Sequence, residues 1–139
     1  MMKYYDAVVA EGLVVRRGRQ EVLRRVAMRV PTGQVVGLLG PSGAGKTTLM
    51  RAVVGAQRTA SGTVTVLGLP AGHRRLRGRI GYMAQSEALY DDLTVEQNLG
   101  YFRRVLGAPA EDVDRVVGDL GLGSVRRSLA SRLSGGQRR

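Results

Sequence analysis

The stretch "GPSGAGKT", Gly40 to Thr47, decides how the rest of this 139-residue sequence is interpreted. It fits the pattern G-x-x-x-x-G-K-[ST]. The apolar run "VVGLL" at 35–39 precedes it and predicts a strand covered on both faces in a parallel sheet. The apolar residues of 49–54 follow at helical spacing, and Gly55 stands where a glycine ends a helix. The motif is therefore predicted between a buried strand and a helix.

Each part of this motif has a physical reason. Glycines let the loop curl, so that successive backbone N–H groups point at phosphate oxygens, and a helix beginning near Lys46 adds the positive end of its dipole. Lys46 is expected to reach the β- and γ-phosphates, and the Thr47 hydroxyl to complete the shell of a Mg²⁺ ion. One of the two lysines in the chain stands in this position. The sequence thus predicts a phosphate-binding loop.

Charge and residue composition limit which further binding sites and cross-links the chain can form. The net charge of +11 comes from 22 basic and 11 acidic residues, and the arginines occur as scattered pairs with few aromatics between them. This pattern favours solvated faces over a base-stacking groove. The absence of cysteine excludes disulfides and thiolate metal sites. His73, the single histidine, is interpreted as a surface loop residue, since one histidine without ligand partners makes no metal site.

No targeting or membrane segment is predicted. The N-terminus has only a four-residue apolar run before Glu11, too short for the h-region of a signal peptide. The apolar run before the loop is far below the roughly 20 residues that a membrane span needs. A soluble, intracellular chain is expected.

The pattern along the chain predicts strands followed by helices. Strands are expected at 7–15 and 26–30, in "SGTVTVLG" at 61–68, and at 80–84. Thr94 and Gln97 form the ends of a capping box that opens a helix to about 106, where Gly107 ends it. "PAEDVDRVVGDLGL" at 109–122 predicts a second helix. The expected fold is α/β, with a β-rich start, a P-loop core and a helical segment.

The phosphate loop together with "GYMAQ" at 81–85 and "LSGGQ" at 133–137 resembles the nucleotide-binding domain of ATP-binding cassette (ABC) transporters. The resemblance runs from about Ala7 to Arg139. It implies a P-loop ABC-type ATPase fold in three parts: a β subdomain at 1–34, a core with the Q-loop at 35–86, and a helical subdomain at 87–139.

The resemblance also implies roles for individual residues. Gln85 matches the Q-loop glutamine, which contacts Mg²⁺ and the attacking water, so Thr47 and Gln85 are the expected metal ligands. The Walker A residues expected to hold ATP are Gly40, Pro41, Ser42, Gly43, Ala44, Gly45, Lys46, Thr47 and Thr48. The signature residues expected to act on the nucleotide of a second subunit, in a head-to-tail dimer, are Leu133, Ser134, Gly135, Gly136 and Gln137.

The family places its Walker B strand, catalytic Glu and switch histidine after the signature motif. The chain is therefore expected to be an N-terminal fragment, cut before Walker B, with no catalytic residue and no hydrolysis of its own. The expected partners are a second ATP-binding domain and a membrane permease, with no nucleic acid. The expected location is cytoplasmic, peripheral at the inner face of the membrane.

Two further positions carry hypotheses. The family's adenine-stacking aromatic falls on Arg17, which is either a stacking guanidinium or an exposed turn residue. "EALYDDLTVEQNL" at 87–99 resembles exporters of the ABC-2 kind, and Tyr90 to Leu93 is the candidate permease contact. Two alternatives remain open: a nucleotide-binding module without turnover, and a soluble ABC ATPase that acts on nucleic acid.

Overall fold

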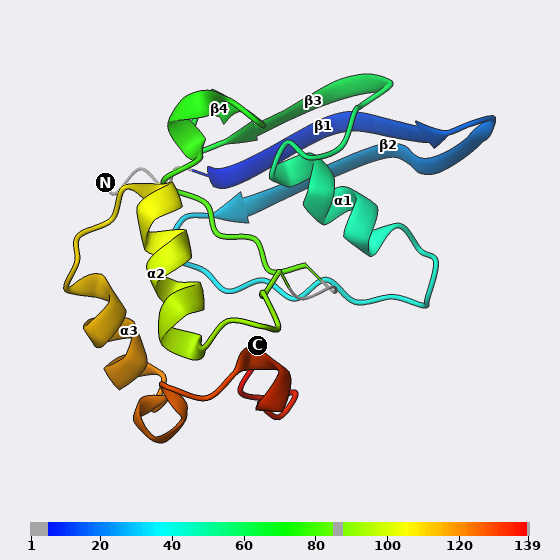
Figure 1. Cartoon of the computed structure of the whole chain (residues 1–139). Coiled ribbons are helices and arrows are strands. Elements are labelled where there is room, and N and C mark those ends of the chain that lie inside the picture. Colours follow the sequence, from blue (N-terminus) through cyan, green and yellow to red (C-terminus); the bar gives the residue numbers. More distant parts are fainter. Residues whose placement is uncertain (1–5, 85–87, 139) are drawn as a thin grey trace. The chain divides into compact units, whose positions relative to one another are not determined.

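A computed structural model describes residues 6–84 and 88–138 of the chain. The chain forms two compact units, Met1–Tyr82 and Met83–Arg139. The first unit holds the sheet and the phosphate loop, and the second holds the helical segment and the serine-glycine turn (Figure 1).

The first unit is built on an antiparallel sheet of order β2-β1-β3-β4. Its strands are β1 (Asp6–Arg17), β2 (Gln20–Pro31), β3 (Ser61–Val66) and β4 (Leu69–Pro70). β1 and β2 form a hairpin whose turn uses Gly18 with φ 58°. The predicted strands at 7–15 and 26–30 are confirmed and extend further than the sequence pattern suggested. The strand predicted at 61–68 is present but ends at Val66, where Leu67 and Gly68 form a turn.

One face of this sheet is covered by helix α1 (Lys46–Val53) (Figure 1). Leu13 and Val15 from the sheet are fully buried, and Leu49 and Ala52 from α1 pack into the same core. The helix begins at Lys46 and is followed by Gly55 with φ 77°, as the sequence predicted. The core therefore fixes the helix that starts at the phosphate loop.

The predicted strands at 35–39 and 80–84 are absent. Val35 and Leu39 are almost fully exposed rather than covered on both faces. The reason is that a strand needs paired neighbours for its N–H and C=O groups. Every strand pairing in the described residues is antiparallel and none includes 35–39. The prediction of a parallel, doubly covered strand is thus wrong for the described part of the chain.

The second unit contains α2 (Val95–Leu106) and α3 (Asp112–Asp119), with short 3-10 turns at Gly123–Val125 and Ala130–Arg132. A further 3-10 turn, Arg74–Leu76, belongs to the first unit. The predicted capping box at Thr94 and Gln97 is present, and Gly107 ends α2 with φ 65°. Within the described ranges no helix is both long and apolar enough to cross a bilayer.

Candidate phosphate-binding site

The loop at 40–45 closes on the side chain of Lys46. The Lys46 Nζ donates to the carbonyl oxygens of Gly40 at 2.7 Å and Pro41 at 2.6 Å. Gly43 and Gly45 adopt φ of 80° and 88°, which glycine adopts without steric cost. The result is a tight loop with an ammonium group held at its rim.

Among the described residues, no side chain caps the N-terminus of α1. Gly45 occupies the N-cap position, and no acidic residue lies in the first turn of the helix. The first N–H groups of a helix have no intrahelical partner, so they need a side chain, water or a ligand. In contrast, α2 is closed by its own Thr94 and Gln97. The open end of α1, behind a glycine loop and beside an ammonium group, fits a phosphate group.

The loop is anchored on β2 at a position that the sequence pattern did not reveal. A Cβ built on Gly45 would lie 2.8 Å from Leu23 Cδ2 and 3.2 Å from the Val22 carbonyl oxygen. Gly45 itself is buried. Position 45 therefore requires glycine for two reasons: the positive φ of its backbone and the close approach of β2.

Thr47 and Thr48 differ in exposure at the start of α1. Thr47 is exposed, so its hydroxyl is accessible to a metal ion, while Thr48 is 4% exposed and belongs to the packed face. Among the described residues no group of three or more His, Cys, Asp or Glu side chains could hold a metal.

The entire excess of positive charge lies in the unit that carries the phosphate loop. Residues 1–82 hold 14 basic and 3 acidic side chains, whereas 83–139 hold 8 of each. No acidic residue occurs between Glu21 and Glu87. The unit that carries the loop is therefore strongly positive, which favours a polyanionic ligand.

The "LSGGQ" residues form a single capped turn in the second unit. The Ser134 Oγ accepts from the Gln137 N–H at 3.3 Å, and the Gln137 Oε1 accepts from the Ser134 N–H at 3.0 Å. The Arg138 N–H closes the turn on the Ser134 carbonyl oxygen at 3.1 Å. Because a hydroxyl accepts and donates, the Ser134 O–H remains a donor for an outside group.

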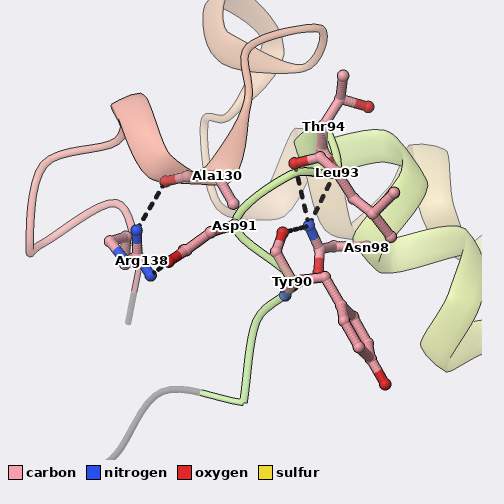
Figure 2. A network of polar contacts seen from close by, with 7 residues as sticks. All are labelled: Tyr90, Asp91, Leu93, Thr94, Asn98, Ala130 and Arg138. Atoms are coloured by element: carbon pink, nitrogen blue, oxygen red, sulfur yellow. Dashed lines mark hydrogen bonds and ion pairs between the residues drawn. The ribbon is translucent and has the colours of Figure 1, made fainter.

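This second capping box repeats the Thr94–Gln97 spacing, S/T-x-x-Q, which could have predicted it from sequence. The turn is also connected, through Arg138, for which the sequence predicted no role, to Asp91 within the candidate permease contact Tyr90–Leu93. Arg138 pairs with Asp91 at 2.6 Å, and buried Asn98 bonds the backbone around Tyr90 (Figure 2). Asp91 and Arg138 lie 47 residues apart in the sequence, and no local pattern predicts that they pair.

The remaining candidates are placed as follows. Arg17 ends β1 opposite Gln20 and is exposed. His73 is half-buried, and its Nδ1 accepts from the Arg75 N–H at 3.2 Å at the start of a 3-10 turn. Gln85 lies outside the described residues.

Comparison with known proteins gives a consistent result. The family model described as "ABC transporter" matches residues 23–139. An uncharacterized ABC transporter ATP-binding protein of Rhizobium meliloti is 35% identical over 149 residues, covering 99% of this chain and 54% of the relative. Nod factor export ATP-binding protein I of Ralstonia nicotianae is 38% identical, covering 93% and 42%. The sulfate/thiosulfate import ATP-binding protein of Synechocystis is 33% identical, covering 95% and 39%.

Solved structures show the same fold. A bacterial Atm1-family ABC exporter with ATP bound superposes with a TM-score of 0.81 at 25% identity, over 99% of this chain and 26% of the exporter chain. An ATP-binding subunit of an ABC transporter superposes with a TM-score of 0.80 at 24% identity, over 95% and 58%. The chain spans about half, or less, of the length of the curated relatives described above.

Proposed function

Because this chain belongs to the ABC transporter family, we propose that it binds MgATP in the loop 40–48 and acts on the nucleotide of a second ATP-binding domain through Ser134, Gly135 and Gly136. Binding and hydrolysis in that assembly would drive transport through a membrane permease. The location that follows is cytoplasmic, at the inner face of the membrane.

The observation that carries the proposal is the uncapped start of α1 beside Lys46. The loop offers backbone N–H groups and an ammonium group, and both prefer a phosphate anion to water. To bind ATP, the Lys46 Nζ exchanges the carbonyl oxygens of Gly40 and Pro41 for phosphate oxygens. A Mg²⁺ ion, when bound, would neutralise part of the phosphate charge. Thr47 would hold this ion, and the family resemblance adds Gln85 as a further ligand.

The serine-glycine turn would contribute in trans. The Ser134 hydroxyl keeps its donor, and exposed glycines at 135 and 136 let a partner's phosphate approach the backbone. These groups position and stabilise the γ-phosphoryl group. Hydrolysis is assigned to the dimer, and no described residue of this chain is given the role of general base.

We assign Arg17 the adenine-stacking role. It is exposed at the end of β1, in the same unit as the phosphate loop. Arg17→Ala should weaken ATP binding about tenfold, since stacking on a base contributes about 1–3 kcal/mol. Pyrophosphate binding should be unchanged. Equal loss of both affinities would refute the assignment.

We propose export as the direction of transport and Tyr90–Leu93 as the permease contact. Support comes from the resemblance of 87–99 to ABC-2 exporters and from the exposure of Tyr90, which is 45% accessible. The named relatives include an exporter and an importer, so direction needs its own assay. Replacing Tyr90 and Leu93 together by Asp should abolish transport in vesicles and leave ATP binding intact. Unchanged transport would remove this contact.

The experiment for the core proposal is a calorimetric titration of the chain with MgATP. Lys46→Ala should weaken binding about 10- to 100-fold, the effect of losing a charge-assisted hydrogen bond. Lys3→Ala, which removes the only other lysine, is the control for net charge and should bind like the parent chain. If the parent chain does not bind MgATP, or if both variants bind equally, the proposed function is wrong.

A further inference from the structure

Backbone hydrogen bonds within the second unit join the candidate permease contact to the 3-10 turn Ala130–Arg132, which directly precedes the serine-glycine turn. The Ala130 N–H donates to the Leu93 carbonyl oxygen at 2.9 Å, and the Ser131 N–H donates to the Asp91 carbonyl oxygen at 3.2 Å. The segment 90–94 therefore runs beside 129–131 (Figure 2), although the paired residues lie 35 to 40 positions apart in the sequence.

Arg138 extends this connection to the turn itself. Its Nη2 lies 2.6 Å from the Asp91 Oδ1, and its Nη1 donates to the Ala130 carbonyl oxygen at 2.9 Å. The Arg138 side chain is only 17% exposed. Exposed ion pairs usually contribute little to stability, but two hydrogen bonds from one planar guanidinium fix the orientation of the Arg138 side chain. Since the Arg138 N–H also bonds the Ser134 carbonyl oxygen, this orientation constrains the position of the Ser134 turn.

Asn98 fixes the other end of the connection to α2. It is 3% exposed, and its side chain bonds Tyr90 twice, through the Tyr90 N–H at 2.9 Å and the Tyr90 carbonyl oxygen at 3.0 Å. Its Nδ2 also lies 3.3 Å from the Leu93 and 3.1 Å from the Thr94 carbonyl oxygen, so its two N–H groups are shared among three acceptors. A fully bonded buried amide of this kind makes the segment rigid. A push on the Tyr90 ring would therefore move 90–94 as one piece.

We propose that Asp91 is a positioning residue for Ser134, and that its ion pair with Arg138 transmits displacement of Tyr90 to the serine-glycine turn. The inference rests on the proposed function only in giving Ser134 a nucleotide to act on. The mechanical connection itself is a property of this chain and can be tested without nucleotide.

The test is nuclear magnetic resonance of the chain. In the parent chain, backbone order parameters at 134–138 should resemble rigid backbone, about 0.85, and in Asp91→Asn they should fall towards 0.6. The double variant Asp91→Arg/Arg138→Asp should restore them, since it rebuilds the pair with reversed charges. Asp119→Asn is the matched control, because it removes a carboxylate paired with Arg115 on α3 at 3.5 Å. Asp119→Asn should leave the backbone order parameters at 134–138 unchanged.

The same nuclear magnetic resonance spectra test whether a change at Tyr90 reaches the serine-glycine turn. Tyr90→Ala should shift the Ser134 and Gly135 amide resonances in the parent background and not in the Asp91→Asn background. Unchanged order parameters in Asp91→Asn, no rescue by the double variant, or equal shifts in both backgrounds would each overturn the inference.

A second arm separates the inference from the proposed function. Asp91→Asn should weaken MgATP-dependent self-association, followed by sedimentation, about tenfold, and change the MgATP affinity of the monomer less than twofold. Order parameters that respond as expected while no chain associates on MgATP would support the positioning role and count against the head-to-tail dimer. Weakened association without altered order parameters would overturn the positioning role.

Discussion

The Lys46 Nζ lies 2.7 Å from the Gly40 carbonyl oxygen, so the ammonium group is held across the loop that it would serve. In the absence of phosphate, this bond and its counterpart to Pro41 stabilise the curled loop. The lysine is thereby kept at the mouth of the loop, which lowers the entropic cost of binding.

The first prediction concerns the loop without ligand. Lys46→Ala should loosen residues 41–44, because the loop loses both bonds to its rim carbonyls. Backbone order parameters there should fall, and the helix after Thr47 should keep its own. The Lys3→Ala chain serves as the comparison. A loop equally rigid in both chains would show that the glycine conformations alone hold it.

The second prediction concerns the metal. Thr47→Val keeps the shape of the side chain and removes the hydroxyl, so the chain should lose most of the difference in affinity between MgATP and ATP in EDTA. Thr47→Ser should keep that difference. Calorimetry with and without Mg²⁺ gives both values. A Thr47→Val chain with the full Mg²⁺ effect would exclude the hydroxyl as a ligand.

The third prediction concerns the contact between the loop and the sheet. Gly45→Ala should lower the free energy of unfolding by about 2–5 kcal/mol, since it adds backbone strain at φ 88° and an overlap with Leu23. Gly33→Ala has a similar φ of 78° but open space around the new methyl group, so it should cost only about 1 kcal/mol. Urea midpoints compare the two. Equal costs would mean that β2 yields to the added methyl group.

The fourth prediction concerns the cap of α2. Thr94→Ala should cost about 0.5–2 kcal/mol, because the Gln97 N–H loses its acceptor. Thr94→Ser keeps the acceptor and should cost less. Urea denaturation followed by helical circular dichroism measures both chains. The same midpoint for Ala and Ser would show that the cap adds no stability.

The fifth prediction concerns pH. The hydrogen bond from the Arg126 guanidinium lowers the pKa of Glu96 below its usual value of 4.5, and the Arg126 charge acts in the same direction while burial opposes it. A lowered folded-state pKa contributes stability above the unfolded value, and this is lost as the pH falls below 4.5 through the folded value. The melting temperature of the parent chain should therefore fall in this range. In Glu96→Gln, the part of this decrease in melting temperature that comes from protonation of Glu96 should be absent.

The local elements followed from the sequence because their causes are local. The boundaries of α1 and α2 agree with the pattern, since caps, terminal glycines and apolar spacing act within a few residues. The strand at 35–39 failed for the opposite reason. Five apolar residues indicate a capacity for burial, whereas burial itself depends on which strands pair with them.

The sequence by itself determined the phosphate loop, the Ser134 turn and the capped helix that opens at Thr94, because each is set by contacts between near neighbours. Only the tertiary structure decided that Gly45 rests on Leu23 and that Asp91 pairs with Arg138. These contacts bridge long stretches of chain, and their existence depends on how β2 and the 90–94 segment are packed. Spacing along the chain carries no record of such packing, since the free energy that selects it is distributed over the whole core.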